Sequence, residues 1–140
     1  MKILLAVDGS AYTERMLAYV AAHPELLGQA REISVLTVTT AVPPLVTGYI
    51  DKASLQIYYS DQAEETLKSV RGFIDQQGWK ADYLTKVGNA AECIAATAKE
   101  GGYDLLVMGS HGHSALGSLV MGSVTSRVLA NCPTALLIVR

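Results

Sequence analysis

The glycine-rich segment at residues 108–123 carries the residues best suited to contact a phosphate group. It follows an apolar run and leads into a helical pattern. Its four glycines are Gly109, Gly112, Gly117 and Gly122. Glycine is expected to let the backbone take positive φ and approach a ligand closely. The helix that follows offers unpaired N–H groups and the positive end of its dipole, so the segment predicts a phosphate-binding loop.

The spacing of these glycines differs from both common phosphate fingerprints. The chain has no Gly-Lys-Ser/Thr, and the third glycine lies too far on for Gly-x-Gly-x-x-Gly. The pattern is Gly-x2-Gly-x9-Gly-Ser, which ends at Ser123. Ser123 can offer its hydroxyl and its N–H to a phosphate, and Val124 and Thr125 add backbone donors in the same first turn.

A second polar group, Asp8-Gly9-Ser10, follows the first apolar run. Such a sequence after a strand is also a common turn and helix cap, in which the Asp side chain bonds its own backbone. Both interpretations of Asp8 stay open, and its place at the end of a central strand favours ligand contact. We interpret Ser10 chiefly as a helix cap.

Two histidines, His111 and His113, lie within the glycine-rich segment and could serve as a general base or as metal ligands. No further Cys, His or acidic cluster completes a coordination shell, so a protein metal site is not indicated. A serine hydrolase is not indicated either, because Gly112-His113-Ser114-Ala115-Leu116 lacks the closing glycine of Gly-x-Ser-x-Gly.

Five short apolar runs alternate with helical patterns. The runs are at residues 3–7, 33–38, 83–87, 105–108 and 135–139. This alternation predicts an α/β domain with an open, five-stranded parallel sheet and helices on both faces. The first and fourth runs are unbroken by polar residues, as in central strands, whereas residues 82–87 alternate like an edge strand. The expected strand order is 3-2-1-4-5.

Apolar side chains at helical spacing predict four helices between these strands. The inward residues are Met16, Leu17 and Val20; Ala63, Leu67, Val70 and Ile74; Ala91, Ile94, Ala95 and Ala98; and Val124 and Val128. Gly101-Gly102 should end the third helix and Cys132-Pro133 the fourth. Residues 41–50 contain two prolines and no clear period, and they predict a long loop, either functional or a spacer.

Composition bounds the class of protein. A chain of 140 residues, 50% hydrophobic, predicts one domain over residues 1–140. A net charge of −2, without a basic cluster, argues against nucleic acid as a partner. No apolar run is long enough to span a bilayer, and the N-terminus lacks the features of a signal peptide, so we expect a cytoplasmic protein. Cys93 and Cys132 are expected to be small buried hydrophobes in a reduced compartment.

Several segments resemble the universal stress protein family, in particular its ATP-binding members. The matching segments are the glycine pattern ending at Gly122-Ser123; Leu4-Leu5-Ala6-Val7-Asp8-Gly9-Ser10; Val87-Gly88-Asn89-Ala90, with alanine where the family usually has proline; and residues 132–139. The resemblance runs nearly end to end. It implies the strand order above and a fold like that of the adenine nucleotide alpha hydrolases.

The resemblance also implies the residues that bind ATP. Ala6, Val7, Val38 and Met108 would surround the adenine. Asp8 would approach the ribose or a bound metal ion. The phosphates would be wrapped by Gly109, His111, Gly112, Gly122, Ser123, Val124 and Thr125. Because the loop has no lysine, neutralisation of ATP must come from the helix dipole, N–H groups and Mg²⁺ or Mn²⁺. Arg127 is a candidate helper, although an exposed charge without a ligand is the simpler interpretation.

These inferences predict an ATP-binding regulatory protein of the stress response, whose nucleotide orders the glycine loop and changes what the molecule presents to an unknown protein partner. No catalytic residue is assigned. One alternative is a slow ATPase or phosphotransferase, and another is a dimeric interaction module that binds no nucleotide. The apolar strand Ala135–Val139 should lie at a sheet edge and join two copies in a homodimer, as the resemblance also implies.

Overall fold

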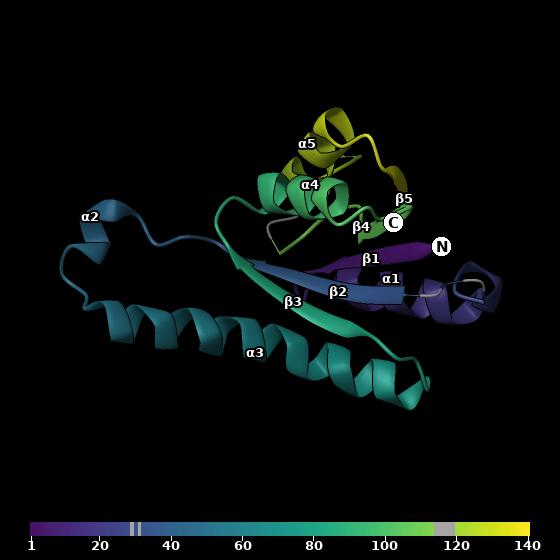
Figure 1. Ribbon diagram of the computed structural model, residues 1–140, viewed down its shortest axis with the longest axis horizontal. Coiled ribbons are helices and arrows are strands. Elements are labelled where there is room, and N and C mark those ends of the chain that lie inside the picture. Colours follow the sequence, from purple (N-terminus) through teal and green to yellow (C-terminus); the bar gives the residue numbers. More distant parts are fainter. Residues whose placement is uncertain (29, 31, 114–119) are drawn as a thin grey trace.

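A five-stranded parallel sheet forms the centre of the molecule, with helices on both faces (Figure 1). The computed structural model describes residues 1–28, 30, 32–113 and 120–140. The strands are β1 (Lys2–Val7), β2 (Glu32–Thr39), β3 (Asp82–Val87), β4 (Leu105–Gly109) and β5 (Ala135–Val139). Neighbouring strands pair in parallel in the order β3-β2-β1-β4-β5. The predicted fold class and strand order are therefore confirmed.

The helices lie in two layers. They are α1 (Ala11–Ala22), the short 3-10 helix η1 (Pro24–Leu26), α2 (Pro44–Thr47), α3 (Lys52–Gln76), α4 (Ala90–Glu100) and α5 (Ser123–Asn131). Figure 1 shows α1 and α3 on one side of the sheet and α4 and α5 on the other. Parallel strands need such helical crossovers, and the crossovers cover both faces of the sheet.

The strand β1 supplies both halves of the hydrophobic core because its side chains alternate between the two faces. Ile3, Leu5 and Val7 pack with α1 and α3. Leu4 and Ala6 pack with α4 and α5. Each of these five side chains is buried, as is typical of a central strand covered on both sides. This position between β2 and β4 explains the unbroken apolar run in the sequence.

The two outer strands differ in their exposure. Most side chains of β3 are exposed or half-buried, which agrees with the edge position that its alternating sequence predicts. The other edge is β5, whose Leu136, Leu137 and Ile138 are half-buried and whose Val139 is buried. The apolar sequence of β5 thus lies at an edge, where its outer backbone groups can pair with another strand.

The segment at residues 41–50 is partly helical, where the sequence predicted only a loop. It contains α2, a helix of four residues, and leads into α3. The buried residues of α3 begin at Ala63, and Figure 1 shows α2 and the start of α3 projecting beyond the sheet. The side chains of Leu45 and Tyr49 on this arm are 86% and 93% exposed. The exposure of these side chains agrees with the lack of an apolar period in this part of the sequence.

The expected end of α4 is confirmed. Gly102 has a φ of +64°, in the left-handed region that glycine adopts readily, and its N–H donates to the carbonyl of Lys99.

Among the described residues, no helix combines the length and the apolar sequence needed to cross a membrane.

Candidate functional site

The glycine-rich segment and the start of α5 meet at the carboxyl end of β4. The N–H of Gly122 donates to the carbonyl of Ser110 at 2.7 Å. The hydroxyl of Thr125, which is buried, donates to the carbonyl of Gly109 at 2.9 Å. These two hydrogen bonds attach the first turn of α5 to the end of the strand. The structure therefore brings Gly109, Gly122 and Thr125 together, as the predicted site requires.

The described glycines of this segment are not needed for positive φ, which corrects the expectation from sequence. In the described part of the chain, positive φ occurs at Gly9, Gly78, Gly88 and Gly102. Gly122, directly before α5, has a φ of −73°. Gly117 lies outside the described residues.

Close packing explains these glycines instead. A Cβ at Gly109 would lie 2.8 Å from the Cβ of Tyr12, and one at Gly112 would lie 2.6 Å from Oδ2 of Asp8. A Cβ at Gly122 would lie 3.2 Å from the Cα of His111. The absence of side chains thus lets the loop, the end of β1 and α1 approach one another at the carboxyl ends of the strands.

The two oxygens of the Asp8 carboxylate have different surroundings. Oδ1 accepts hydrogen bonds from the N–H of Ser10 and from the hydroxyl of Thr13, both at 2.9 Å. The hydroxyl of Thr13 also accepts from the N–H of Asp8 at 3.0 Å. Oδ2 faces Gly112 of the glycine-rich segment. The turn interpretation therefore applies to Oδ1, and ligand contact by Oδ2 stays a prediction.

Ser10 occupies the N-cap position of α1, but its side chain makes no capping hydrogen bond. Its hydroxyl is buried and has no hydrogen-bond partner among the described residues. The expectation that Ser10 caps the helix through its side chain is wrong. The Asp8 carboxylate and the Thr13 hydroxyl organise this turn in its place.

Both histidines make contacts within the loop region. Nε2 of His113 lies 2.7 Å from the carbonyl oxygen of Asp8, which joins the loop to the end of β1. Nδ1 of His111 lies 2.9 Å from the hydroxyl of Ser110, and its ring is tilted by 41° against the ring of Tyr12, with 5.0 Å between the ring centroids. Within the described ranges, no group of three or more His, Cys, Asp or Glu side chains is placed to hold a metal ion.

The four residues expected around an adenine lie on two faces of the sheet. Ala6 pairs with Met108 across β1 and β4, and both pack with Val38 on the α4 and α5 side. Val7 packs on the opposite side, against α1 and α3. Ala6, Val7 and Met108 are also buried. A ligand on the α4 and α5 side could therefore reach Val7 only through its backbone.

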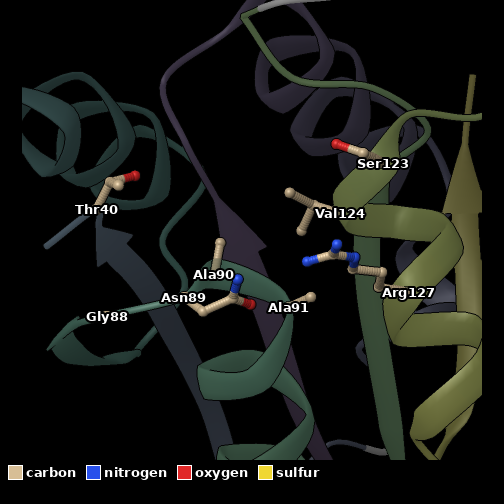
Figure 2. Close-up of a pocket in the computed structure, with 8 residues that line it drawn as sticks. All are labelled: Thr40, Gly88, Asn89, Ala90, Ala91, Ser123, Val124 and Arg127. Carbon is tan, nitrogen blue, oxygen red and sulfur yellow. The ribbon is translucent and has the colours of Figure 1, made fainter.

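A pocket of about 200 Å³ lies beyond the carboxyl ends of β2 and β3, between α4 and α5 (Figure 2). Its lining residues are Thr40, Gly88, Asn89, Ala90, Ala91, Ser123, Val124 and Arg127. Of the residues predicted to bind phosphate, the pocket includes Ser123 and Val124. The segment at residues 87–90 carried a sequence signal for the opposite wall, but its residues were not assigned to the site.

Val124 differs from its predicted burial. Its side chain is 36% exposed and faces the pocket, whereas Thr125 and Val128 form the buried face of α5. The sequence of this short helix permits burial of either the Val124 side or the Thr125 side. The hydrogen bond of Thr125 to the end of β4 accompanies burial of the Thr125 side.

The wall from α4 is fixed by Gly88 and Asn89. Gly88 has a φ of +151°, and its N–H donates to the carbonyl of Thr39 at the end of β2. Oδ1 of Asn89 accepts from the N–H of Glu92 at 3.1 Å and caps α4. The departure from the family pattern at Ala90 therefore leaves an ordinary capped helix start beside the pocket.

Arg127 lies one turn after Ser123 on α5. Its side chain is exposed, as expected, but it also lines the pocket, and Figure 2 shows its guanidinium extending toward the first turn of α4. No ion pair with Arg127 occurs in the ranges that the structure describes.

Comparison of the sequence with known proteins gives matches over the full length. The profile of the universal stress protein family matches residues 1–140. A universal stress protein of Thermus aquaticus is 34% identical over 139 residues, which are 99% of this chain and 97% of that protein. Universal stress protein Slr1230 of Synechocystis is 30% identical over 91% of this chain, but the match spans only 38% of Slr1230.

Solved structures share the fold. MJ0577 of Methanocaldococcus jannaschii superposes with a TM-score of 0.81 at 28% identity, over 99% of this chain and 94% of that one, although the sequence match covers 50% of MJ0577. A universal stress protein of Archaeoglobus fulgidus in complex with dAMP has a TM-score of 0.67 at 22% identity, over 100% and 98% of the two chains. An Arabidopsis thaliana family protein with AMP bound has a TM-score of 0.67 at 14% identity, over 99% and 91%.

Proposed function

Because the chain belongs to the universal stress protein family, we propose that it binds an adenine nucleotide, and specifically ATP, at the carboxyl edge of its sheet. The observation that carries this proposal is the pocket between α4 and α5, which opens beside Ser123 and Val124. Ligands of open parallel sheets bind in this position, outside the carboxyl ends of the strands. The family structures that hold AMP and dAMP support an adenine nucleotide as the ligand class.

The phosphates would lie at the first turn of α5. Ser123 offers a hydroxyl there, and the first N–H groups of the helix carry its positive dipole end. The loop supplies no lysine, so Mg²⁺ or Mn²⁺ bound to the phosphates would neutralise part of the charge of ATP. Oδ2 of Asp8 is the candidate protein contact for the ribose or the metal ion.

The role we propose is regulatory. The contact of His113 with the carbonyl of Asp8 shows that the glycine-rich segment can bridge to β1, and a bound nucleotide would hold the segment there. The surface that the molecule presents to a second copy or to another protein would then depend on the nucleotide. The homodimer, the regulated partner and the cytoplasmic location stay predictions.

A calorimetric titration tests the proposal. Wild-type protein should bind Mg-ATP, and Gly122→Val should weaken binding because its side chain would press on the backbone of Ser110 and His111. The matched control is Gly72→Val, which adds the same side chain on α3. Apart from the adjacent residues and the backbone of α3 itself, no heavy atom of the described residues lies within 4 Å of the new Cβ. Equal affinity in wild type and a folded Gly122→Val variant would contradict the assignment.

Mass spectrometry of the denatured protein identifies the nucleotide independently. The purified protein should release ATP in near-stoichiometric amount if the affinity is high. Release of AMP or of a cyclic nucleotide would keep the nucleotide-binding function but replace ATP as the ligand.

A further inference from the structure

We propose that Arg127 binds a phosphate group of the nucleotide and makes the affinity of the pocket depend on the charge of that group. This inference rests on the proposed nucleotide-binding function and adds a residue and a specificity to it. Arg127 lines the pocket together with Ser123, and it is the only charged residue among the described residues that line it.

The position of Arg127 on α5 directs its guanidinium toward the first turn of the helix. Residues four apart lie on the same helix face, and helical side chains lean toward the N-terminus. Arg127 therefore shares a face with Ser123, and Figure 2 shows Val124 between Ser123 and the guanidinium. Figure 2 shows the guanidinium on the pocket side of α5, directed toward Ala90 and Ala91 of α4.

The pocket leaves room for an anion in front of this guanidinium. The facing residues of α4, Ala90 and Ala91, have the smallest side chain that a helix favours, and Asn89 uses its Oδ1 on the N–H of Glu92. An anionic oxygen between the two helices would meet the guanidinium from α5 and the N–H groups of the first turn of either helix. Within the described ranges, no carboxylate that would repel it lines the pocket.

The Arg127 side chain differs from those of Arg71 and Arg15 because it has no ion pair or ring contact with the described residues. Arg71 pairs with Glu64 and lies over the ring of Tyr83, and Arg15 lies over the ring of Tyr12. In the described ranges no such ion pair or ring contact involves Arg127. Its charge is thus available to a ligand without the loss of an existing interaction.

The chemistry of the guanidinium suits a phosphate. Its planar N–H groups can donate two parallel hydrogen bonds to two phosphate oxygens, and it stays charged at all ordinary pH values. Because the glycine-rich segment has no lysine, Arg127 would supply the cationic side chain that phosphate-binding loops of other classes take from the loop itself. The benefit should apply to AMP, ADP and ATP but not to adenosine.

The experiment measures the affinities of adenosine, AMP and Mg-ATP for wild type, Arg127→Gln and Arg127→Lys. Loss of charge-assisted hydrogen bonds should weaken AMP and Mg-ATP binding roughly 10- to 100-fold in Arg127→Gln. Arg127→Lys should recover part of this loss, and adenosine should bind all three proteins equally. The control is Lys99→Gln, which removes the same charge from the last turn of α4 and should leave every affinity unchanged.

The outcomes separate this inference from the proposed function. If wild type binds the nucleotides and Arg127→Gln binds AMP with the same affinity, the role of Arg127 is refuted and the nucleotide function remains. The same conclusion follows if Arg127→Gln loses affinity for adenosine and for AMP to the same extent. If wild type binds no nucleotide, the proposed function fails. A titration with inorganic pyrophosphate then completes the test, because pyrophosphate binding that depends on Arg127 would show an anion site without a nucleoside, and its absence would overturn the inference as well.

Discussion

At the residue scale, the turn after β1 shows how one carboxylate serves the fold and the candidate site together. The Thr13 hydroxyl bridges Oδ1 and the N–H of Asp8, and the carboxylate in turn binds the N–H of Ser10. These bonds hold Asp8 in one orientation, with Oδ2 toward Gly112. A residue that contacts ligand benefits from such support, since its geometry is then set before the ligand arrives.

We predict that the removal of two hydroxyls of this turn changes stability by very different amounts. Thr13→Val should lower the free energy of unfolding by about 1–3 kcal/mol, because it leaves the half-buried carboxylate and N–H of Asp8 without their hydrogen bonds to the buried Thr13 hydroxyl. Ser10→Ala should cost less than about 0.5 kcal/mol or stabilise, because the Ser10 hydroxyl is buried without a partner in the described chain. Urea unfolding measures both values. A loss of about 1 kcal/mol in Ser10→Ala would instead show that its side chain caps α1.

A further prediction at this scale is that any ATP hydrolysis is slow. His111 and His113 contact Ser110 and the Asp8 carbonyl, and no carboxylate or histidine is assigned to orient an attacking water. We expect a kcat well below about 1 s⁻¹, the lower end of the usual enzyme range. A steady-state assay of phosphate release checks this. A kcat of about 1 s⁻¹ or more that disappears in the double variant His111→Ala/His113→Ala, with affinity unchanged, would favour the enzyme.

At the scale of elements, the sequence predicted each helix that packs on the sheet and was least informative where helices leave it. The buried stripe of α3, from Ala63 to Ile74, was read correctly because those side chains face the core. The exposed start of α3 and the short α2 carry no such period. In α5, the predicted burial of Val124 was wrong because a helix of nine residues permits two apolar faces. The contact of Thr125 with the end of β4 decides which face is buried.

The packing of α3 against the edge strand β3 leads to a prediction at alkaline pH. Partial burial, followed by the negative charge of Asp75, raises the pKa of the Tyr83 hydroxyl, against a smaller lowering by Arg71. The folded state therefore favours neutral Tyr83. This contribution to stability is fully present below the ordinary tyrosine pKa of about 10 and is lost as pH rises through the raised value.

This effect is measured by urea unfolding of wild type and Tyr83→Phe between pH 8 and 11. The range extends roughly one to two pH units around the ordinary tyrosine pKa. The stability of wild type relative to Tyr83→Phe should be constant at the lower end and should fall above about pH 10. In an Asp75→Asn background the fall should be smaller, because one cause of the raised pKa is removed. A difference that does not change with pH would contradict the role of Tyr83.

At the scale of the whole molecule, the fold followed from sequence almost completely and the site only in part. Five apolar runs with helical crossovers permit few arrangements, and the right-handed crossover rule reduces them further. The rest of the site could be identified only from the structure. Arg127 and Asn89 are 38 positions apart in the sequence, and the packing of α4 beside α5 places them on facing walls of one pocket. The glycines illustrate the same limit, since their neighbours, such as Tyr12 beside Gly109, belong to distant segments.

Assembly gives the prediction that belongs to the whole molecule. The edge strand β5 exposes part of an apolar sequence, and we expect it to pair with β5 of a second copy about a two-fold axis. Ile138→Lys should shift the molecule toward a monomer, as light scattering at micromolar concentration would show. Thr85→Lys, which adds the same charge on the opposite edge strand β3, should leave the mass unchanged. A wild-type monomer under these conditions would refute the dimer.

The strand order also has a consequence for the chain during its synthesis on the ribosome. The strands β1, β2 and β3 are made first and are neighbours in the sheet, so they can pair before the rest of the chain exists. The pocket, in contrast, takes one wall from α4 and the other from α5, both of which are translated after these three strands. A nascent chain that stops before Ser123 has every strand but one and still lacks the wall that carries Arg127. Nucleotide would therefore stabilise only chains that extend through α5, because shorter chains lack one wall of the pocket.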